Sequence, residues 1–151
     1  MKRKLALSLL VFVVLVGGLL HYTQNASSSS SVTPFVTTFD VDRTDDNAGA
    51  TACTAAPNDC SLRGAIIAAN ANANVDPVTI NLQPGTTYNL TLANATQENA
   101  AATGDLDITT SLHSVTIAGG GSSGLNATVI DAGGLNTGTM HDRAFHITAS
   151  C

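Results

Sequence analysis

Three aspartates in the second half of the chain are the side chains best suited to bind a metal ion. Asp105 and Asp107 flank Leu106 in a predicted strand, so their carboxylates point to the same face of that strand. With Asp131 from a neighbouring strand, they would supply the oxygen ligands that Ca²⁺ prefers. No lysine or arginine base accompanies the pair, and Leu106 is expected to face the core. We therefore expect the two carboxylates simply to face water.

The histidines near the end of the chain offer little further chemistry. The run His141-Asp142-Arg143 combines a base, an acid and a cation, but sequence neighbours on one loop seldom assemble into a site. We interpret this run as a solvated turn. His146 lies between two apolar residues that we expect to point inward, which leaves its own side chain outside. Neither His146 nor His113 has a partner that the sequence identifies.

The acidic segment from Asp40 to Thr51 hints at a calcium loop but does not follow the pattern of one. Thr44 stands at the fifth position, no glycine follows it, and the twelfth position holds Thr51 rather than glutamate. We interpret the segment as a solvated turn. No cofactor is therefore predicted, and Ca²⁺ is the alternative.

The chain has three cysteines, Cys53, Cys60 and Cys151. Cys53 and Cys60 are close in sequence, with Pro57-Asn58 between them to turn the chain, whereas a metal site would need more ligands at set spacing. We predict a disulfide between Cys53 and Cys60. Such a bridge suits an exported protein, because disulfides persist in oxidising compartments. Cys151 would then be left without a partner.

The N-terminal segment is predicted to be a targeting segment rather than part of the fold. Three basic residues precede an apolar run over residues 5–20, and a serine-rich tract follows. This is the layout of a signal peptide over residues 1–26, with a linker over residues 27–34. The alternative is a membrane anchor formed by residues 5–20, although about 24 Å of helix is shorter than the roughly 30 Å hydrocarbon core.

Net charge argues against nucleic acid as a partner. The chain carries 6 basic and 11 acidic residues, a formal net charge of −5, and loss of the leader would remove three of the basic residues. Phosphate backbones are bound by clustered lysine and arginine side chains. We therefore expect no nucleic-acid partner, and contact with a membrane only through an uncleaved leader.

One helix is expected ahead of a series of short strands. Leu62, Ala65 and Ile66 recur with helical spacing on one apolar face, which predicts a helix over residues 61–74. After Pro77, apolar residues alternate with polar ones, and turn-forming glycines or prolines separate the runs. The predicted strands are residues 35–39, 78–82, 88–92, 106–108, 115–117, 129–130 and 145–147.

These strand lengths favour a parallel β-helix over a β-sandwich. Most runs are only three to five residues long, and the Asn-Gly and Asp-Gly pairs that mark tight hairpins are absent. We therefore predict an all-β fold in which residues 78–151 form a short and incomplete series of coils. Residues 35–77 are expected to cap the first coil, because an open stack would expose strand edges and apolar surface.

The sequence CSLRGAIIAANAN, residues 60–72, closely resembles the Cys-Ser/Thr-Leu-Arg-Glu-Ala motif of the CSLREA domain. The similarity extends over roughly residues 36–148, from the acidic lead DVDRTDDNAGATACTAAPNDC through DPVTINLQPGTTYNLTL to the closing RAFHI. That domain lies near the N-terminus of bacterial secreted and surface proteins. The resemblance implies a right-handed parallel β-helix of the pectin-lyase-like class. It places in the capping helix the residues Ser61, Leu62, Arg63, Ala65 and Ile66.

One departure from this motif is Gly64, which stands where the family has glutamate. With Ser61 as the N-cap, a glutamate at position 64 would complete a capping box and return a hydrogen bond to the cap. The sequence therefore predicts that Gly64→Glu stabilises the fold by about 1 kcal/mol. We also expect Arg63 to pair with Asp59 or with an aspartate of the acidic segment.

These expectations lead to three hypotheses about function. The first is a non-catalytic secreted or cell-surface β-helix module for adhesion or envelope structure, the N-terminal part of a longer protein, with a surface glycan or envelope component as its partner. The second is a calcium-dependent, polysaccharide-lyase-like enzyme of the pectin-lyase fold that uses Asp105, Asp107 and Asp131. The third is a truncated product without autonomous function.

Overall fold

The computed structural model describes residues 35–136 and 142–148, all within the unit Pro34–Cys151. These residues form mostly short strands, with one α-helix and two 3₁₀ turns, which confirms the predicted mainly-β class. The predicted leader (1–26), the linker (27–34) and Cys151 lie outside the described residues. Within the described ranges, no helix is long and apolar enough to span a membrane.

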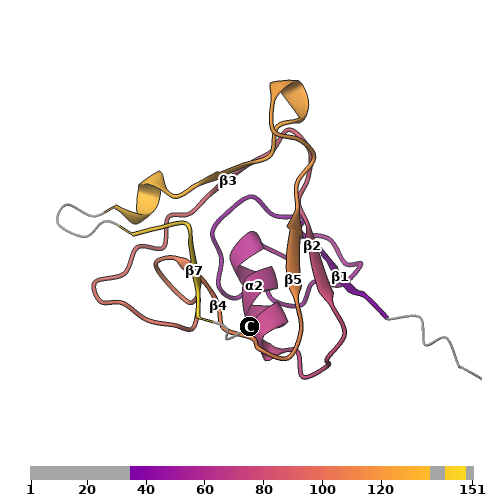
Figure 1. The fold of residues 1–151 in the computed structure, drawn as a ribbon. Helices are drawn as coiled ribbons and strands as arrows, with labels where there is room; N and C mark the ends of the chain where they lie inside the picture. Colours follow the sequence, from indigo (N-terminus) through magenta and orange to yellow (C-terminus); the bar gives the residue numbers. More distant parts are fainter. Residues whose placement is uncertain (1–34, 137–141, 149–151) are drawn as a thin grey trace, which may run out of the picture. The chain divides into compact units, whose positions relative to one another are not determined.

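Seven strands and one α-helix follow the chain in the order that Figure 1 shows. The strands are β1 (Thr37–Asp40), β2 (Val78–Asn81), β3 (Thr87–Asn89), β4 (Leu106–Ile108), β5 (Val115–Ala118), β6 (Val129–Asp131) and β7 (Phe145–Ile147). The helix is α2 (Leu62–Ala71), and the 3₁₀ turns are η1 (Gly124–Asn126) and η2 (Gly133–Leu135). Each of the seven predicted runs overlaps one strand.

All pairs between these strands are parallel. β1, β2 and β5 form one sheet in that order, β3 pairs with β6, and β4 pairs with β7. Along the chain, β2, β3 and β4 are therefore followed by β5, β6 and β7. Each of these three later strands pairs with the strand three places before it. Figure 1 shows β1, β2 and β5 side by side and β7 beside β4.

Apolar side chains in matching register form the core. Ile80 of β2 is paired with Phe39 of β1 on one side and with Ile117 of β5 on the other. Leu106 of β4 is paired with Phe145 of β7 in the same way. Ile80 and Leu106 are fully buried, whereas their partners are only partly buried. The strands β2 and β4 therefore lie deeper in the core than the strands on the later side of each pair.

The helix α2 begins where the sequence predicts but ends before position 74. Ser61 is its N-cap, and the Ser61 hydroxyl oxygen accepts the backbone N–H of Gly64 at 2.9 Å. At the other end, Asn72 is the C-cap, and its side-chain oxygen accepts the N–H of Asn74 at 3.0 Å. Asparagine side chains that bond the backbone in this way favour turns over helix. The helix therefore stops at Ala71.

One face of α2 joins the core. Leu62, Ala65 and Ile66 are buried and belong to the same cluster as the inward residues of β2 and β4. Burying a leucine or isoleucine side chain contributes about 1.5–3 kcal/mol. This contact places the polar side chains of α2 against β4.

Candidate functional site

Polar side chains of α2 take the place of a neighbouring strand along one edge of β4. The backbone of β4 bonds to β7 through Leu106 and Ile108. The carbonyl oxygen of Asp107, between them, instead accepts a hydrogen bond from the Asn70 side-chain amide at 2.7 Å. The side-chain oxygen of Asn70 in turn accepts the N–H of Thr109 at 2.9 Å. A strand edge that would otherwise be unpaired is therefore satisfied by one asparagine.

Arg63, two turns earlier on α2, covers the chain that leads into β4. Its guanidinium donates to the backbone oxygens of Ala101 at 2.9 Å and Gly104 at 2.7 Å. It also donates to both carboxylate oxygens of Asp46, at 2.5 and 3.1 Å. The Arg63 side chain is fully buried, and these bonds engage its Nε and both terminal nitrogens.

Asp46 extends this cover to the end of β3. One of its carboxylate oxygens accepts the backbone N–H groups of Thr91 at 2.7 Å and Leu92 at 2.8 Å. Burial acts to raise the pKa of Asp46, but the hydrogen bonds from Arg63 and from these two N–H groups outweigh it and lower the pKa below 3.8. Removing one partner of such a buried ion pair costs about 3–5 kcal/mol, because the other charge is left unpaired.

The interpretation of residues 40–51 as a solvated turn is therefore wrong at Asp46, whose side chain is fully buried. The expected pairing of Arg63 with an aspartate of this segment is made by Asp46. Asp59, the other candidate, accepts hydrogen bonds from Thr54 instead. Asn70 and its contact with β4 were missed, because an asparagine in a helix carries no pattern that marks a strand edge as its partner.

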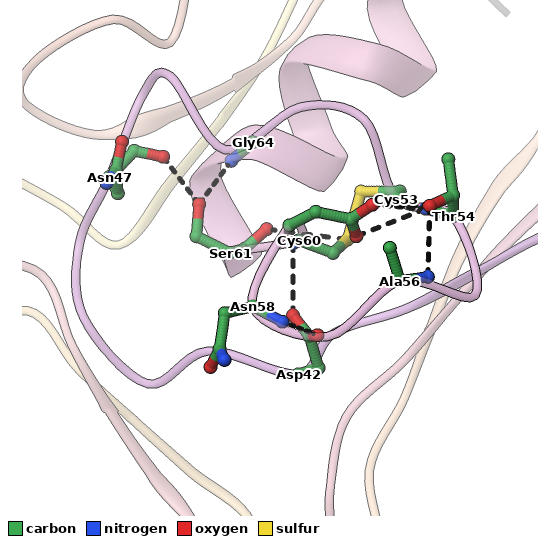
Figure 2. Close-up of a disulfide and its surroundings, with 10 residues drawn as sticks. Asp42, Asn47, Cys53, Thr54, Ala56, Asn58, Cys60, Ser61 and Gly64 are labelled. Carbon is green, nitrogen blue, oxygen red and sulfur yellow. Dashed lines mark hydrogen bonds between the residues drawn. A yellow bond between two sulfur atoms is a disulfide. The ribbon is translucent and has the colours of Figure 1, made fainter.

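A disulfide between Cys53 and Cys60 closes the loop ahead of α2, as Figure 2 shows, and confirms the predicted bridge. The carboxylate of Asp42, just after β1, accepts the N–H of Cys60 at 3.0 Å and also the N–H of Asn58. Burial acts to raise the pKa of Asp42, but these backbone hydrogen bonds lower it. The bridge and the carboxylate together fix the start of α2 to the end of β1.

The predicted gain from Gly64→Glu is wrong. A Cβ atom at position 64 would lie 1.8 Å from the carbonyl oxygen of Ala50. That oxygen accepts the N–H of Ser61 at 3.2 Å, so the backbone on both sides is held in place. The Ser61 hydroxyl is also fixed, since it donates to the carbonyl oxygen of Asn47 (Figure 2). Glycine is required here by the close approach of two backbone segments.

Asp105 and Asp107 are fully buried, so the expectation that they face water is wrong. The segment before β4 folds over them. The side-chain amide of Gln97 donates to Asp105 at 3.1 Å, and the backbone N–H of Ala101 donates to Asp107 at 3.3 Å. The alternation of side chains in β4 was correct, but the sequence did not show that a loop covers the outer face.

The same two carboxylates contact the segment that ends in β7. The Nε of Arg143 donates to Asp105 at 2.7 Å, and Nδ1 of His146 lies 2.9 Å from the Asp107 carboxylate. Burial raises the pKa of Asp107, although the bond with His146 acts to lower it. The interpretation of His146 as unpartnered is therefore wrong. Arg143 is exposed, as a solvated turn requires, but its guanidinium also pairs with Asp105. His141 lies outside the described residues.

Asp105, Asp107 and His146 are the group of described residues with suitable spacing for a metal ion. One ligand atom of each lies within 4.8 Å of the others. Each of the four carboxylate oxygens already accepts a hydrogen bond, and Arg143 supplies a positive charge. An ion would have to displace Arg143. The arrangement is therefore a closed polar network that joins β4 to β7.

Asp131 does not join this network. It is exposed on β6, in register with Asn89, and its carboxylate accepts the N–H of Gly133 at 2.8 Å. His113 also lies elsewhere, with Nδ1 2.9 Å from the carbonyl oxygen of Asn74. The structure thus brings together only two of the three aspartates that the sequence suggested for calcium.

No protein-family model, curated protein or solved structure matches the chain. The resemblance to the CSLREA domain therefore rests on the motif and on the order of segments in the sequence, and it stays a prediction.

Proposed function

We propose that residues 35–148 are the capped first coils of a right-handed parallel β-helix, which serves a secreted or cell-surface protein as a non-catalytic adhesion or envelope module. The strand order supports this, because β2, β3 and β4 are followed in the same order by their parallel partners. Parallel strands joined by crossovers almost always follow a right-handed course.

The observation that carries the proposal is the replacement of a strand by α2. Asn70 and Arg63 bond to the backbone at and before β4, and Asp46 bonds to the backbone after β3. A stack of coils needs such cover at its first turn, since bare edges template further strand pairing and aggregation. Residues with these partners have a capping role, which leaves no group on α2 free for catalysis.

The later strand of each pair, namely β5, β6 or β7, provides evidence that further coils follow. Three side chains on these strands are only partly buried, although their register partners are buried. The pairs are Ile117 with Ile80, Ile130 with Tyr88, and Phe145 with Leu106. Additional coils stacked on β5, β6 and β7 would bury these side chains. We therefore propose that the module is the N-terminal part of a longer β-helix.

A secreted or surface location is supported by the Cys53–Cys60 disulfide, which is stable outside reducing compartments. The acidic character of the chain, with a net charge of −5, makes a glycan or envelope component a better partner than nucleic acid. The calcium-dependent lyase is not favoured, because Asp105 is paired with Arg143, Asp107 contacts His146, and Asp131 lies on another strand pair.

Export of the full chain from a bacterial host tests the proposal. We expect the chain in the envelope or medium fraction, with Cys53 and Cys60 oxidised and with no cleavage of polygalacturonate or alginate with or without calcium. The matched control is a Cys53→Ser/Cys60→Ser chain, which keeps the leader and loses the bridge. Retention of the wild-type chain in the cytoplasm would contradict the location. Calcium-dependent cleavage that is lost in Asp105→Asn would contradict the non-catalytic role.

A further inference from the structure

An open pocket of about 450 Å³ lies on the cap, beside the disulfide loop. Small residues form part of its lining, namely Gly49, Ala50 and Ala52. The rest of the lining is polar and consists of Arg43, Asn47, Asn58 and Asp59. From this lining we infer that the pocket binds a neutral saccharide, the end of a glycan that the surface module would contact. The inference supplies a ligand class for the proposed surface function and depends on that function for its biological setting.

Arg43 supplies fixed hydrogen-bond donors. Its Nε and one terminal nitrogen donate to the two oxygens of Asp45 at 2.8 and 2.7 Å, and the other terminal nitrogen donates to the carbonyl oxygen of Asn58 at 3.0 Å. An arginine has five N–H groups, so two remain free while the plane of the guanidinium is held from both sides. Donors fixed in this way bind a hydroxyl group with little loss of conformational entropy.

Asp59 and Asn47 add an acceptor and further donors. The hydrogen bonds that Asp59 accepts come from Thr54: its Oδ2 accepts two of them and its Oδ1 accepts one, so a lone pair remains on Oδ1. The side-chain oxygen of Asn47 accepts the N–H of Gly49 at 2.8 Å, which leaves the Asn47 NH₂ group directed elsewhere. A sugar hydroxyl both donates and accepts, so it matches a lining that offers both donors and an acceptor.

Charge around the pocket excludes an anionic ligand. The lining contains one cation, Arg43. Three carboxylates lie in or beside the lining, namely Asp59, Asp42 and Asp45. A phosphate, sulfate or uronate would be repelled by this excess of carboxylates. The lining has no aromatic side chain to stack on a base or an apolar ring. A polyol of one or two sugar rings without an acidic group fits both the volume and the charge.

One wall of the pocket is held in place by a disulfide and by hydrogen bonds. The Cys53–Cys60 disulfide closes the loop that carries Asn58, and the Asp42 carboxylate accepts the N–H of Asn58 (Figure 2). Asn58 itself has a φ of 62°, a left-handed conformation that asparagine tolerates. The loop is therefore held in one shape by covalent and hydrogen bonds.

The experiment is a titration of the oxidised, ¹⁵N-labelled full chain with glucose, N-acetylglucosamine and galacturonate. We expect saturable shifts of the backbone amides of Gly49, Ala50 and Ala52 with the two neutral sugars. Galacturonate is expected to bind at least about fivefold more weakly than glucose, because the carboxylates in and beside the lining repel its own carboxylate. Tighter binding of galacturonate than of glucose would overturn the assignment, as would the absence of saturable shifts.

Two variants locate the binding site. Asp59→Asn removes the charged acceptor, and Ala52→Leu fills the pocket from an exposed position without removing a hydrogen bond. Both are expected to weaken neutral-sugar binding by about fivefold or more, whereas Asp131→Asn, a change at a remote exposed carboxylate, leaves it unchanged. Equal binding by all four proteins would overturn the assignment. The export and lyase assays do not depend on sugar binding. A protein that is exported but binds no sugar would therefore overturn the pocket assignment and leave the surface-module function standing.

Discussion

The carbonyl oxygen of Ala50 decides which residue can occupy position 64. It lies where a Cβ atom would project, and it is held there by the N–H of Ser61. A capping-box glutamate at this position would need a Cβ in the space that this oxygen fills. The chain keeps the serine cap and satisfies its hydroxyl through the carbonyl of Asn47 instead.

The prediction at this position is that Gly64→Ala destabilises the fold by about 3 kcal/mol, because one added methyl group forces two backbone segments apart. The measurement is the free energy of unfolding in urea. Gly49→Ala is the matched control, since its added Cβ meets only a side-chain oxygen of Asn47 at 3.3 Å, and it is expected to change stability by less than about 0.5 kcal/mol. Equal effects of the two changes would refute this account.

Two buried aspartates are expected to respond to pH with opposite signs. The pKa of Asp46 is lowered in the fold, so its contribution to stability is present above pH 3.8 and is lost as the pH falls through the folded pKa. The pKa of Asp107 is raised by burial, so its contribution is fully present below pH 3.8 and is lost as the pH rises through the folded pKa.

The pH prediction compares Asp46→Asn with Asp107→Asn by the free energy of unfolding in urea from pH 3 to pH 8. At neutral pH, Asp46→Asn is expected to be less stable than the wild type by about 3–5 kcal/mol, because Arg63 loses its buried partner, and the deficit shrinks toward low pH. Asp107→Asn is expected to match or exceed the wild type at neutral pH, since it removes a buried charge and keeps an acceptor for Ala101. A large loss of stability at neutral pH in Asp107→Asn would show that the pair with His146 is net stabilising.

The sequence predicted a contact between two residues only where few other residues could serve as partners. Two cysteines in one short loop, and one arginine near an acidic segment, narrowed the partners to Cys53–Cys60 and to an aspartate before α2. The contact between Asp107 and His146 joins residues far apart in sequence and depends on the register of β4 with β7. No local pattern carries that register.

At the level of elements, α2 acts as a strand substitute. Its apolar face packs on the core, while Asn70 donates to the carbonyl of Asp107 and accepts from the N–H groups of Thr109 and Thr110. A helix rises only about 1.5 Å per residue, so its side chains rather than its backbone must reach successive groups of a strand. The apolar period of α2 was visible in the sequence, whereas this use of its polar face was not.

The prediction for this element is that Asn70→Ala costs about 2–3 kcal/mol, because it leaves three part-buried backbone groups of the β4 edge without a partner. Amide hydrogen exchange provides the specific measurement. Thr109 and Thr110 should exchange faster in Asn70→Ala than in the wild type. Asn81→Ala is the control, because the Asn81 side chain donates one exposed hydrogen bond, to Asp40. Unchanged protection of Thr109 would mean that α2 does not stabilise this edge.

At the level of the described unit, the repeated parallel pairing is the feature on which the β-helix proposal depends. The alternation of apolar and polar residues in the sequence predicted where the strands lie, and each predicted run overlaps one observed strand. It did not predict which strands pair, because alternation is the same in a sandwich and in a stack of coils. The parallel pairing of β2, β3 and β4 with the strands three places later is what separates these two architectures.

Register across β2 and β5 can be tested by cross-linking. Thr79 and Thr116 are in register on the outward face of parallel neighbours, where Cα atoms lie about 4.8 Å apart, a distance that a disulfide spans. In a Cys151→Ser background, Thr79→Cys/Thr116→Cys is expected to form a bridge on oxidation. By closing a loop of about 40 residues, the bridge should stabilise the fold by about 3–4 kcal/mol.

The control is Thr79→Cys/Ala118→Cys, on the same face but two residues out of register, where the separation of about 8 Å prevents a bridge. Thiol counting by mass spectrometry distinguishes the two pairs. A bridge in the control pair alone would mean that β5 is shifted by two residues along β2, and bridges in neither pair would argue against adjacent parallel strands and against the β-helix.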